Sequence, residues 1–141
     1  MKLKINPKFK PCPEDDEDEL FLNGIFHFNI TKMLQFIKEN PDSFPIEIVG
    51  VESVYTGVEK TLDEAFIPKA NLSNPIILGE IAPNRFNVID GNHRLEKAYR
   101  EGVSKISAYR ISPKDHLQFL TSETGYRAYV GYWNEKLNQL E

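Results

Sequence analysis

The stretch Phe-Asn-Val-Ile-Asp-Gly-Asn-His-Arg at positions 86–94 joins a short apolar segment to a segment with helical periodicity. Residues 86–89 are apolar and β-prone, which predicts a buried strand. Leu95 and Ala98 then recur at helical spacing, and Gly102 follows as the expected end of the helix. A strand that turns through a glycine into a helix leaves backbone N–H groups without intrahelical partners. The turn therefore predicts an anion site, above all for phosphate.

Each residue of this turn has a chemical role available. Gly91 permits a positive φ or a close approach of the backbone to a ligand, and Asn92 can cap the helix. Arg94 offers a planar guanidinium that matches phosphate oxygens in pairs, and His93 donates hydrogen bonds or moves a proton near neutral pH. Asp90, at the end of the strand, either holds a metal ion or orients Arg94. The alternative is a structural turn with a surface histidine and an ion pair.

Composition is that of an ordinary globular protein, with 141 residues of which 40% are hydrophobic and 27% charged. This length predicts one domain. The net charge of −4 argues against broad nucleic-acid binding, which needs a basic surface. The one cysteine, Cys12, cannot form an internal disulfide, and no cluster has zinc-ligand spacing. The lone thiol favours a reducing cytoplasm, and because no long apolar run is present, we expect no membrane span.

Apolar runs bounded by proline, glycine and asparagine predict the elements around the turn. Residues 1–20, with three prolines and the acidic run 14–19, are expected to be a solvated extension. The strand at 86–89, the helix after it and the strand at 106–111 predict a βαβ unit, preceded by a hairpin. The other predicted elements are a helix over 31–39 capped by Thr31, strands over 46–49 and 51–55 with a bend at Gly50, a helical face over 62–66 ended by Pro68, a strand over 75–81, and helices from 113 and 126.

The last predicted helix carries an aromatic and apolar stripe that includes Tyr129 and Trp133. Such a stripe is typical of a core or of a contact between two copies of a chain. Gly131 lies inside this helix and lowers its stability, so we expect its backbone to pack closely against a neighbour.

The turn and its flanks resemble the ParB/sulfiredoxin superfamily. The resemblance runs from Pro75 to Ile111 and is centred on 87–99, where a strand ends in Asp-Gly and is followed by one variable residue, His, Arg and an alanine-bearing helix. It implies an α+β fold with a mixed β-sheet and packed helices. The implied division is an extension over 1–20 and a single domain over 21–141, with its core at 46–111 and C-terminal helices at 112–141.

In this superfamily the turn binds nucleotide phosphates. The resemblance therefore implies that Gly91, Asn92, His93 and Arg94 bind a nucleotide, ATP, ADP or CTP, with Mg²⁺ held through Asp90. Similar stand-alone proteins are kinases of small molecules that use a glutamate as a base. By that resemblance Glu52 activates the hydroxyl of a small-molecule acceptor and His93 is the second catalytic residue. Two other glutamates compete with Glu52 for this role, Glu47 and Glu59.

Two departures from the superfamily pattern argue against particular functions of its members. Asn92 stands where sulfiredoxins carry their redox cysteine, so sulfiredoxin activity is not expected. A partition protein is not expected either, because the tail has no Arg-rich cluster. The first hypothesis is nucleotide-dependent phosphotransfer or hydrolysis. One alternative is a non-catalytic module that binds a nucleotide, or that binds a protein partner or a second copy through the 126–140 helix. The other alternative is a ParB-like nuclease, but the sequence lacks the carboxylate cluster and the basic groove that a nuclease needs.

Overall fold

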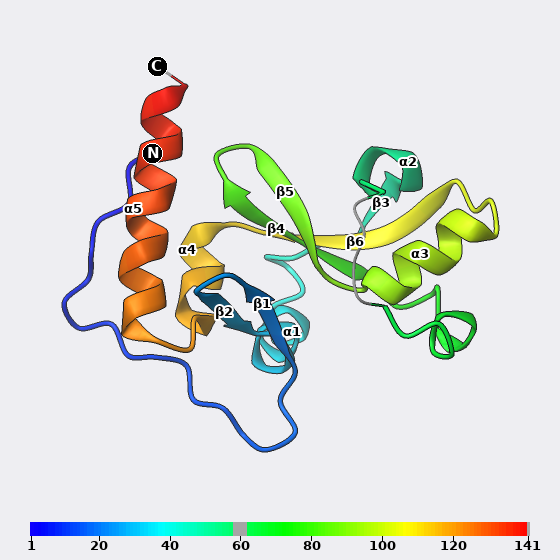
Figure 1. The fold of residues 1–141 in the computed structure, drawn as a ribbon, viewed down its shortest axis with the longest axis horizontal. Coiled ribbons are helices and arrows are strands. Elements are labelled where there is room, and N and C mark those ends of the chain that lie inside the picture. Colours follow the sequence, from blue (N-terminus) through cyan, green and yellow to red (C-terminus); the bar gives the residue numbers. More distant parts are fainter. Residues whose placement is uncertain (58–61, 141) are drawn as a thin grey trace.

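The computed structural model describes residues 1–57 and 62–140, and in these ranges the fold is α+β, with five α-helices and two sheets (Figure 1). One sheet has four strands, and the other is a separate two-stranded hairpin. The strands of the larger sheet, in spatial order, are β3 (Glu47–Gly50), β6 (Lys105–Ile111), β4 (Ile76–Ala82) and β5 (Arg85–Asp90). β4 pairs parallel with β6, and the other two pairs are antiparallel, so the sheet is mixed.

The hairpin of β4 and β5 forms as predicted, with a turn at Pro83 and Asn84. The helix α3 (Asn92–Arg100) then carries the chain across β4 to β6. The predicted βαβ unit is therefore wrong in its pairing, because β4 lies between the two strands that flank α3. The physical reason is that β5 has already paired with β4 through a short local turn, and β6 is left with the other edge of β4.

Side chains alternate between the two faces of this sheet, and each face has its own core. Ile76 and Leu78 of β4 pack with Leu95 and Ala98 of α3 on one face. Ile77 belongs to the opposite core, which is built with the hairpin, α1 (Ile30–Glu39) and α5 (Glu123–Gln139). Figure 1 shows α5 and α3 at opposite ends of the molecule. The turn that begins α3 thus sits on the face away from the larger core.

Two helix starts differ from the sequence-based expectation. The cap of α1 is Asn29, whose side chain accepts a hydrogen bond from the Lys32 N–H, and Thr31 instead accepts from the Glu19 N–H. Residues 51–54 form a short helix, α2 (Val51–Val54), where a continuing strand was predicted. The strand stops because β6 begins at Lys105 and offers no further pairing residue. The Val51 N–H donates to the Ser104 carbonyl as the chain turns away.

The helical face predicted over 62–66 is also not formed. Residues 64–66 make a turn, which leads into a 3-10 helix, η1 (Ile67–Lys69). Pro68 lies inside this short 3-10 helix, so it does not end a helix over 62–66 as predicted. Proline is tolerated there because the first N–H groups of a helix have no intrahelical partner.

A hairpin that the sequence analysis did not predict lies between the acidic run and α1. Its strands are β1 (Leu20–Asn23) and β2 (Phe26–Asn29), joined by a two-residue turn at Gly24 and Ile25, where Gly24 has a φ of 62°. Phe28 is fully buried in the larger core. The hairpin is tied to the start of α5, since the Thr121 N–H donates to the His27 carbonyl.

The N-terminal segment, expected to be solvated, lies along α5 (Figure 1). The Asn134 side chain accepts from the Leu3 N–H and donates to the Leu3 carbonyl, both at 2.8 Å. The Phe9 ring stacks on Tyr126 with centroids 4.0 Å apart, and Cys12 is buried. Apolar side chains and main-chain groups of the segment thus find partners on α5, and part of the surface suggested for a second copy is covered by the chain itself.

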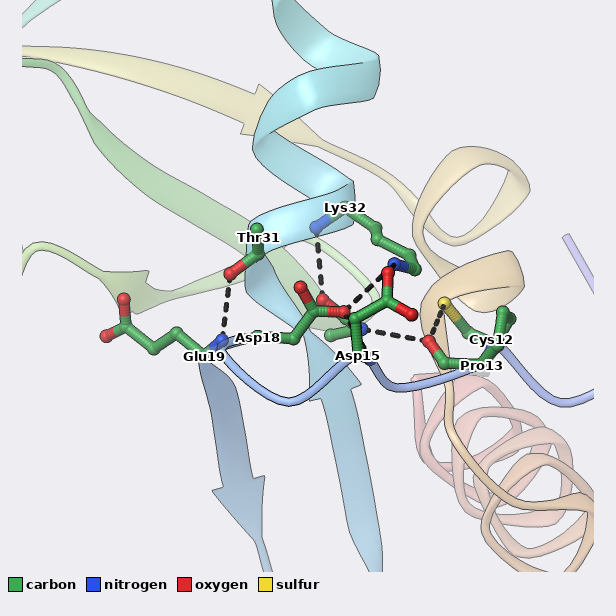
Figure 2. A network of polar contacts seen from close by, with 8 residues as sticks. Cys12, Pro13, Asp15, Asp18, Glu19, Thr31 and Lys32 are labelled. Atoms are coloured by element: carbon green, nitrogen blue, oxygen red, sulfur yellow. Dashed lines mark hydrogen bonds and ion pairs between the residues drawn. The ribbon is translucent and has the colours of Figure 1, made fainter.

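The acidic run is fastened to α1 by one lysine (Figure 2). The Lys32 ammonium lies 2.6 Å from the Asp15 carboxylate and 2.9 Å from that of Asp18. The Asn29 side chain donates to Asp18 and to the Pro13 carbonyl. The hydrogen bond from Asn29, with further bonds from the Asp15 backbone and Lys32, lowers the pKa of Asp18 to about 2. The run is therefore ordered by specific contacts.

In the C-terminal part of the chain, the prediction of a buried aromatic stripe is confirmed, but the prediction of which glycine packs closely is wrong. After the short α4 (Pro113–His116), Tyr129 and Trp133 of α5 are buried, as expected for a core stripe. Gly131 faces open space, so the prediction that its backbone packs closely is wrong. Gly125 has that role, because a Cβ there would lie 2.7 Å from the Ile25 carbonyl oxygen.

Candidate functional site

The turn between β5 and α3 requires glycine at position 91. Gly91 has a φ of 95° and a ψ of 23°, in the left-handed region. A Cβ on this residue would lie 2.5 Å from Ile76 Cγ2 and 2.8 Å from Arg94 Nη2. Both the backbone conformation and the lack of space exclude other residues. The prediction that Gly91 permits a positive φ is therefore confirmed.

The start of α3 has no side-chain cap. Gly91 is the cap residue and Asn92, predicted as the cap, is already the first helical residue. Within the described residues the first helical hydrogen bond runs from the Leu95 N–H to the Gly91 carbonyl, at 2.9 Å. Gly91 therefore supplies no capping side chain, and the positive end of the helix dipole lies at this turn.

Arg94 is held beneath the turn, with its side chain 19% exposed. Its Nη2 donates to Asp90 Oδ2 and to the Pro75 carbonyl, both at 3.2 Å. Its Nε is buried and has no hydrogen-bond partner in the described part of the chain. Asp90 therefore orients Arg94, which was one of its two predicted roles, and the buried Nε–H is left without an acceptor among the described residues.

His93 faces the loop that precedes η1. Its Nε2 accepts a hydrogen bond from the Asp63 N–H at 3.1 Å, and Phe66 approaches the ring edge-on at 5.1 Å. Because Nε2 accepts here, the geometry assigns the proton of the neutral imidazole to Nδ1. In this arrangement His93 fastens a loop to the turn.

A cleft of about 850 Å³ opens beside the turn. Asn92, Glu96 and Arg100, spaced one helical turn apart on α3, line one side of it. Leu95 of the same helix also lines it. The other described lining residues come from β1, β5, the end of α2 and the segment after it, namely Phe21, Leu22, Asn23, Phe86, Asn87, Val88, Val54, Tyr55, Thr56, Gly57, Leu62 and Glu64. Asn92 is the one predicted site residue among them. The volume is within the usual range for small-molecule sites.

A chain of polar contacts crosses this cleft. Glu96 accepts from Tyr55 Oη at 3.0 Å and from Arg100 Nε at 2.9 Å. Arg100 also donates to both carboxylate oxygens of Glu64, at 2.9 Å each. The hydrogen bond to Glu96 raises the pKa of Tyr55, and that from Arg100 lowers the pKa of Glu64. Two carboxylates share one guanidinium, so this group carries one net negative charge.

Glu19, at the start of β1, is a member of the site that the sequence analysis missed. Partial burial raises the pKa of its carboxyl, the nearby Asp90 charge adds to this, and Arg94 opposes it. Its backbone is fixed by the Glu19 N–H, which donates to Thr31, and its side chain points away from the Lys32 ammonium (Figure 2). The sequence signal was weak, because Glu19 is only the last residue of an acidic run.

The structure does not bring the predicted catalytic and metal-binding residues together at the cleft. Glu52 is exposed in the first turn of α2 and does not line the cleft. Of its rivals, Glu47 pairs with Arg110 at 3.2 Å, and Glu59 lies outside the described residues. Across residues 1–57 and 62–140 no group of three or more His, Cys, Asp or Glu side chains could hold a metal ion. Asp90, the predicted metal ligand, is paired with arginine.

Two further findings concern the chain as a whole. Among the described residues, no helix combines the length and the apolar character needed to cross a bilayer. Comparison of the chain with protein-family models, with curated proteins and with solved structures finds no match.

Proposed function

We propose that this chain binds a nucleotide in the cleft beside α3, with the phosphates at the turn formed by residues 90–94. The observation that carries the proposal is the uncapped start of α3, which opens next to a cleft of nucleotide size. The half-buried rings of Phe21, Tyr55 and Phe86 along this cleft supply surface for a base. The guanidinium of Arg94 lies at this turn, with its side chain 19% exposed, and its planar shape suits a phosphate oxygen pair.

We further propose that the domain belongs to the ParB/sulfiredoxin type. Its support is the mixed sheet of four strands together with the Asp-Gly-Asn-His-Arg turn between β5 and α3. Mg²⁺ would be held through Asp90 together with phosphate oxygens of the nucleotide, because the ion is commonly held by one or two carboxylates and by phosphate oxygens. Bound there, it would neutralise phosphate charge.

Thermal unfolding of the full chain with ATP, ADP, CTP and GTP, each with and without Mg²⁺, tests the binding. A ligand at 100 times its Kd stabilises the native state by about 2.7 kcal/mol, which for this chain length raises Tm by roughly 5–10 °C. Arg94→Lys keeps the charge and loses the planar fork, so the shift should shrink. Arg127→Lys, at an exposed arginine of α5, is the matched control. If no nucleotide raises Tm at millimolar concentration, the proposal fails.

Phosphotransfer or hydrolysis is the reaction we propose for this site, and it needs a base. Glu52 is the candidate implied by the sequence resemblance, whereas Glu96 lines the cleft directly. Release of ADP or phosphate should be measured for the wild type, Glu52→Gln and Glu96→Gln. Loss of turnover with retained binding identifies the base. Binding without turnover in the wild type identifies a non-catalytic module.

A further inference from the structure

The cleft lies between two strand edges. β5 ends the order of the larger sheet, and β1 pairs with β2 alone among the described strands. Three consecutive residues of each strand, 21–23 and 86–88, line the cleft. Phe86 and Val88 belong to the core beneath α3, and Asn87 between them, whose side chain points to the opposite face, also lines the cleft, so the edge of β5 borders it. Main-chain donors and acceptors of both strands are therefore directed at this space.

The two edges run in opposite directions along the cleft. β1 begins directly after Glu19, and β5 ends at Asp90. These carboxylates are close enough for the charge of Asp90 to raise the pKa of Glu19. The start of β1 thus lies near the end of β5, and from there residues of both strands line the cleft. A strand placed between them would be antiparallel to one and parallel to the other.

The edge of β1 has none of the usual protection. Exposed edge strands generally carry a charged residue, a proline or a bulge, which keeps other strands from pairing. β1 reads Leu-Phe-Leu-Asn with an unbroken register to β2, and Leu22 is 62% exposed. An apolar edge of this kind is a template for another strand.

We propose that the cleft captures an extended basic peptide, which adds as a strand to the edges of β1 and β5. Main-chain hydrogen bonds supply the affinity, and alternate apolar side chains of the peptide contact Phe86 and Leu22. The group formed by Glu64, Glu96 and Arg100 has one net negative charge, so it favours lysine or arginine in the peptide. This inference goes beyond nucleotide binding and does not depend on it, although the two ligands would compete for one cleft.

Titration of the ¹⁵N-labelled full chain with the peptide acetyl-Lys-Val-Lys-Val-Lys-amide tests the proposal. We expect saturable shifts of the amides of residues 20–23 and 85–88. The same peptide N-methylated at both valines loses the main-chain donors that face one of the two edges, and it should bind at least about tenfold more weakly. The peptide with glutamate in place of lysine should also bind more weakly. Equal binding of the N-methylated peptide, or no shift with the basic peptide at millimolar concentration, overturns the proposal.

A pair of leucine variants locates the binding. Leu22→Lys introduces edge protection and repels a basic peptide, so affinity should fall about tenfold. Leu140→Lys changes a leucine of similar exposure, 66%, at the end of α5 and should leave affinity unchanged. Equal effects of both variants would refute the site. Nucleotide shifts of Tm without peptide binding would refute this inference alone, and peptide binding without nucleotide shifts would refute only the proposed function.

Discussion

His116 makes the stability of this fold sensitive to mild acid. Its side chain is fully buried, with Phe28 and Tyr129 edge-on to the ring at 5.1 and 5.5 Å. The Nε2 N–H donates to the Glu80 carbonyl at 2.9 Å, and Nδ1 has no partner within the described residues. Burial lowers the pKa of His116 from its usual 6.5 to about 4, because a charged ring here would lose its hydration.

The sign and size of the effect follow from proton linkage. His116 binds a proton more weakly in the folded chain than in the unfolded chain, so its full contribution to stability is present above pH 6.5. That contribution is lost as the pH falls from 6.5 towards 4. A difference of about 2.5 pKa units predicts a loss of roughly 2.5 kcal/mol between pH 7 and pH 4.5.

Urea unfolding at several pH values between 7 and 4.5, on the wild type and His116→Gln, measures this loss. Glutamine keeps an N–H donor for the Glu80 carbonyl and does not titrate. The variant should be less stable at pH 7, because it loses ring packing, and the difference should shrink by roughly 2.5 kcal/mol at pH 4.5. Parallel curves would refute the reasoning. NMR titration of His116 in the wild type provides a second measurement that needs no variant, and a pKa near 6.5 would contradict it.

Five further substitutions are checked by urea unfolding or hydrogen exchange. Gly91→Ala should cost at least about 2 kcal/mol because it adds a clash to the positive φ, whereas Gly102→Ala, at a positive φ in open space, should cost only about 1 kcal/mol. Gly131→Ala should stabilise α5 by up to about 1 kcal/mol, and Gly125→Ala should destabilise it, since only the latter meets a backbone oxygen. Asn134→Ala should raise amide exchange across residues 1–10 and leave β4 protected; unchanged exchange at the N-terminus would contradict the docking described above.

The elements around the turn were predictable because their signals are local. β4, β5, α3 and β6 are apolar or periodic segments bounded by proline, asparagine or glycine, and each forms within a residue or two of its predicted bounds. The hairpin of β1 and β2 was missed although Gly24 opens its two-residue turn, a recognisable hairpin signal, because the acidic run before it suggested an extension. The order of strands was not predictable, since it depends on which edge of β4 each partner reaches.

In the candidate site, too, local features were predictable and contacts between distant segments were not. The need for glycine at position 91 follows from a turn between adjacent elements and was predicted. The second wall of the cleft comes from the β1 hairpin, and Glu19 reaches the turn only through the folded chain. No spacing in the sequence connects Glu19 with Asp90. The role of His93 was likewise hidden, because its partner, the Asp63 N–H, is a main-chain group in an irregular loop.

The buried position of Cys12 turns the one thiol of the chain into a sensor of how its N-terminal segment docks. The side chain is 8% exposed, and burial raises its pKa, so the reactive thiolate is scarce while the segment is in place. The Cys12 N–H is also tied to the Leu120 carbonyl at 2.8 Å. Alkylation of Cys12 at pH 8 therefore requires the N-terminal segment to open, and the rate of alkylation reports that opening.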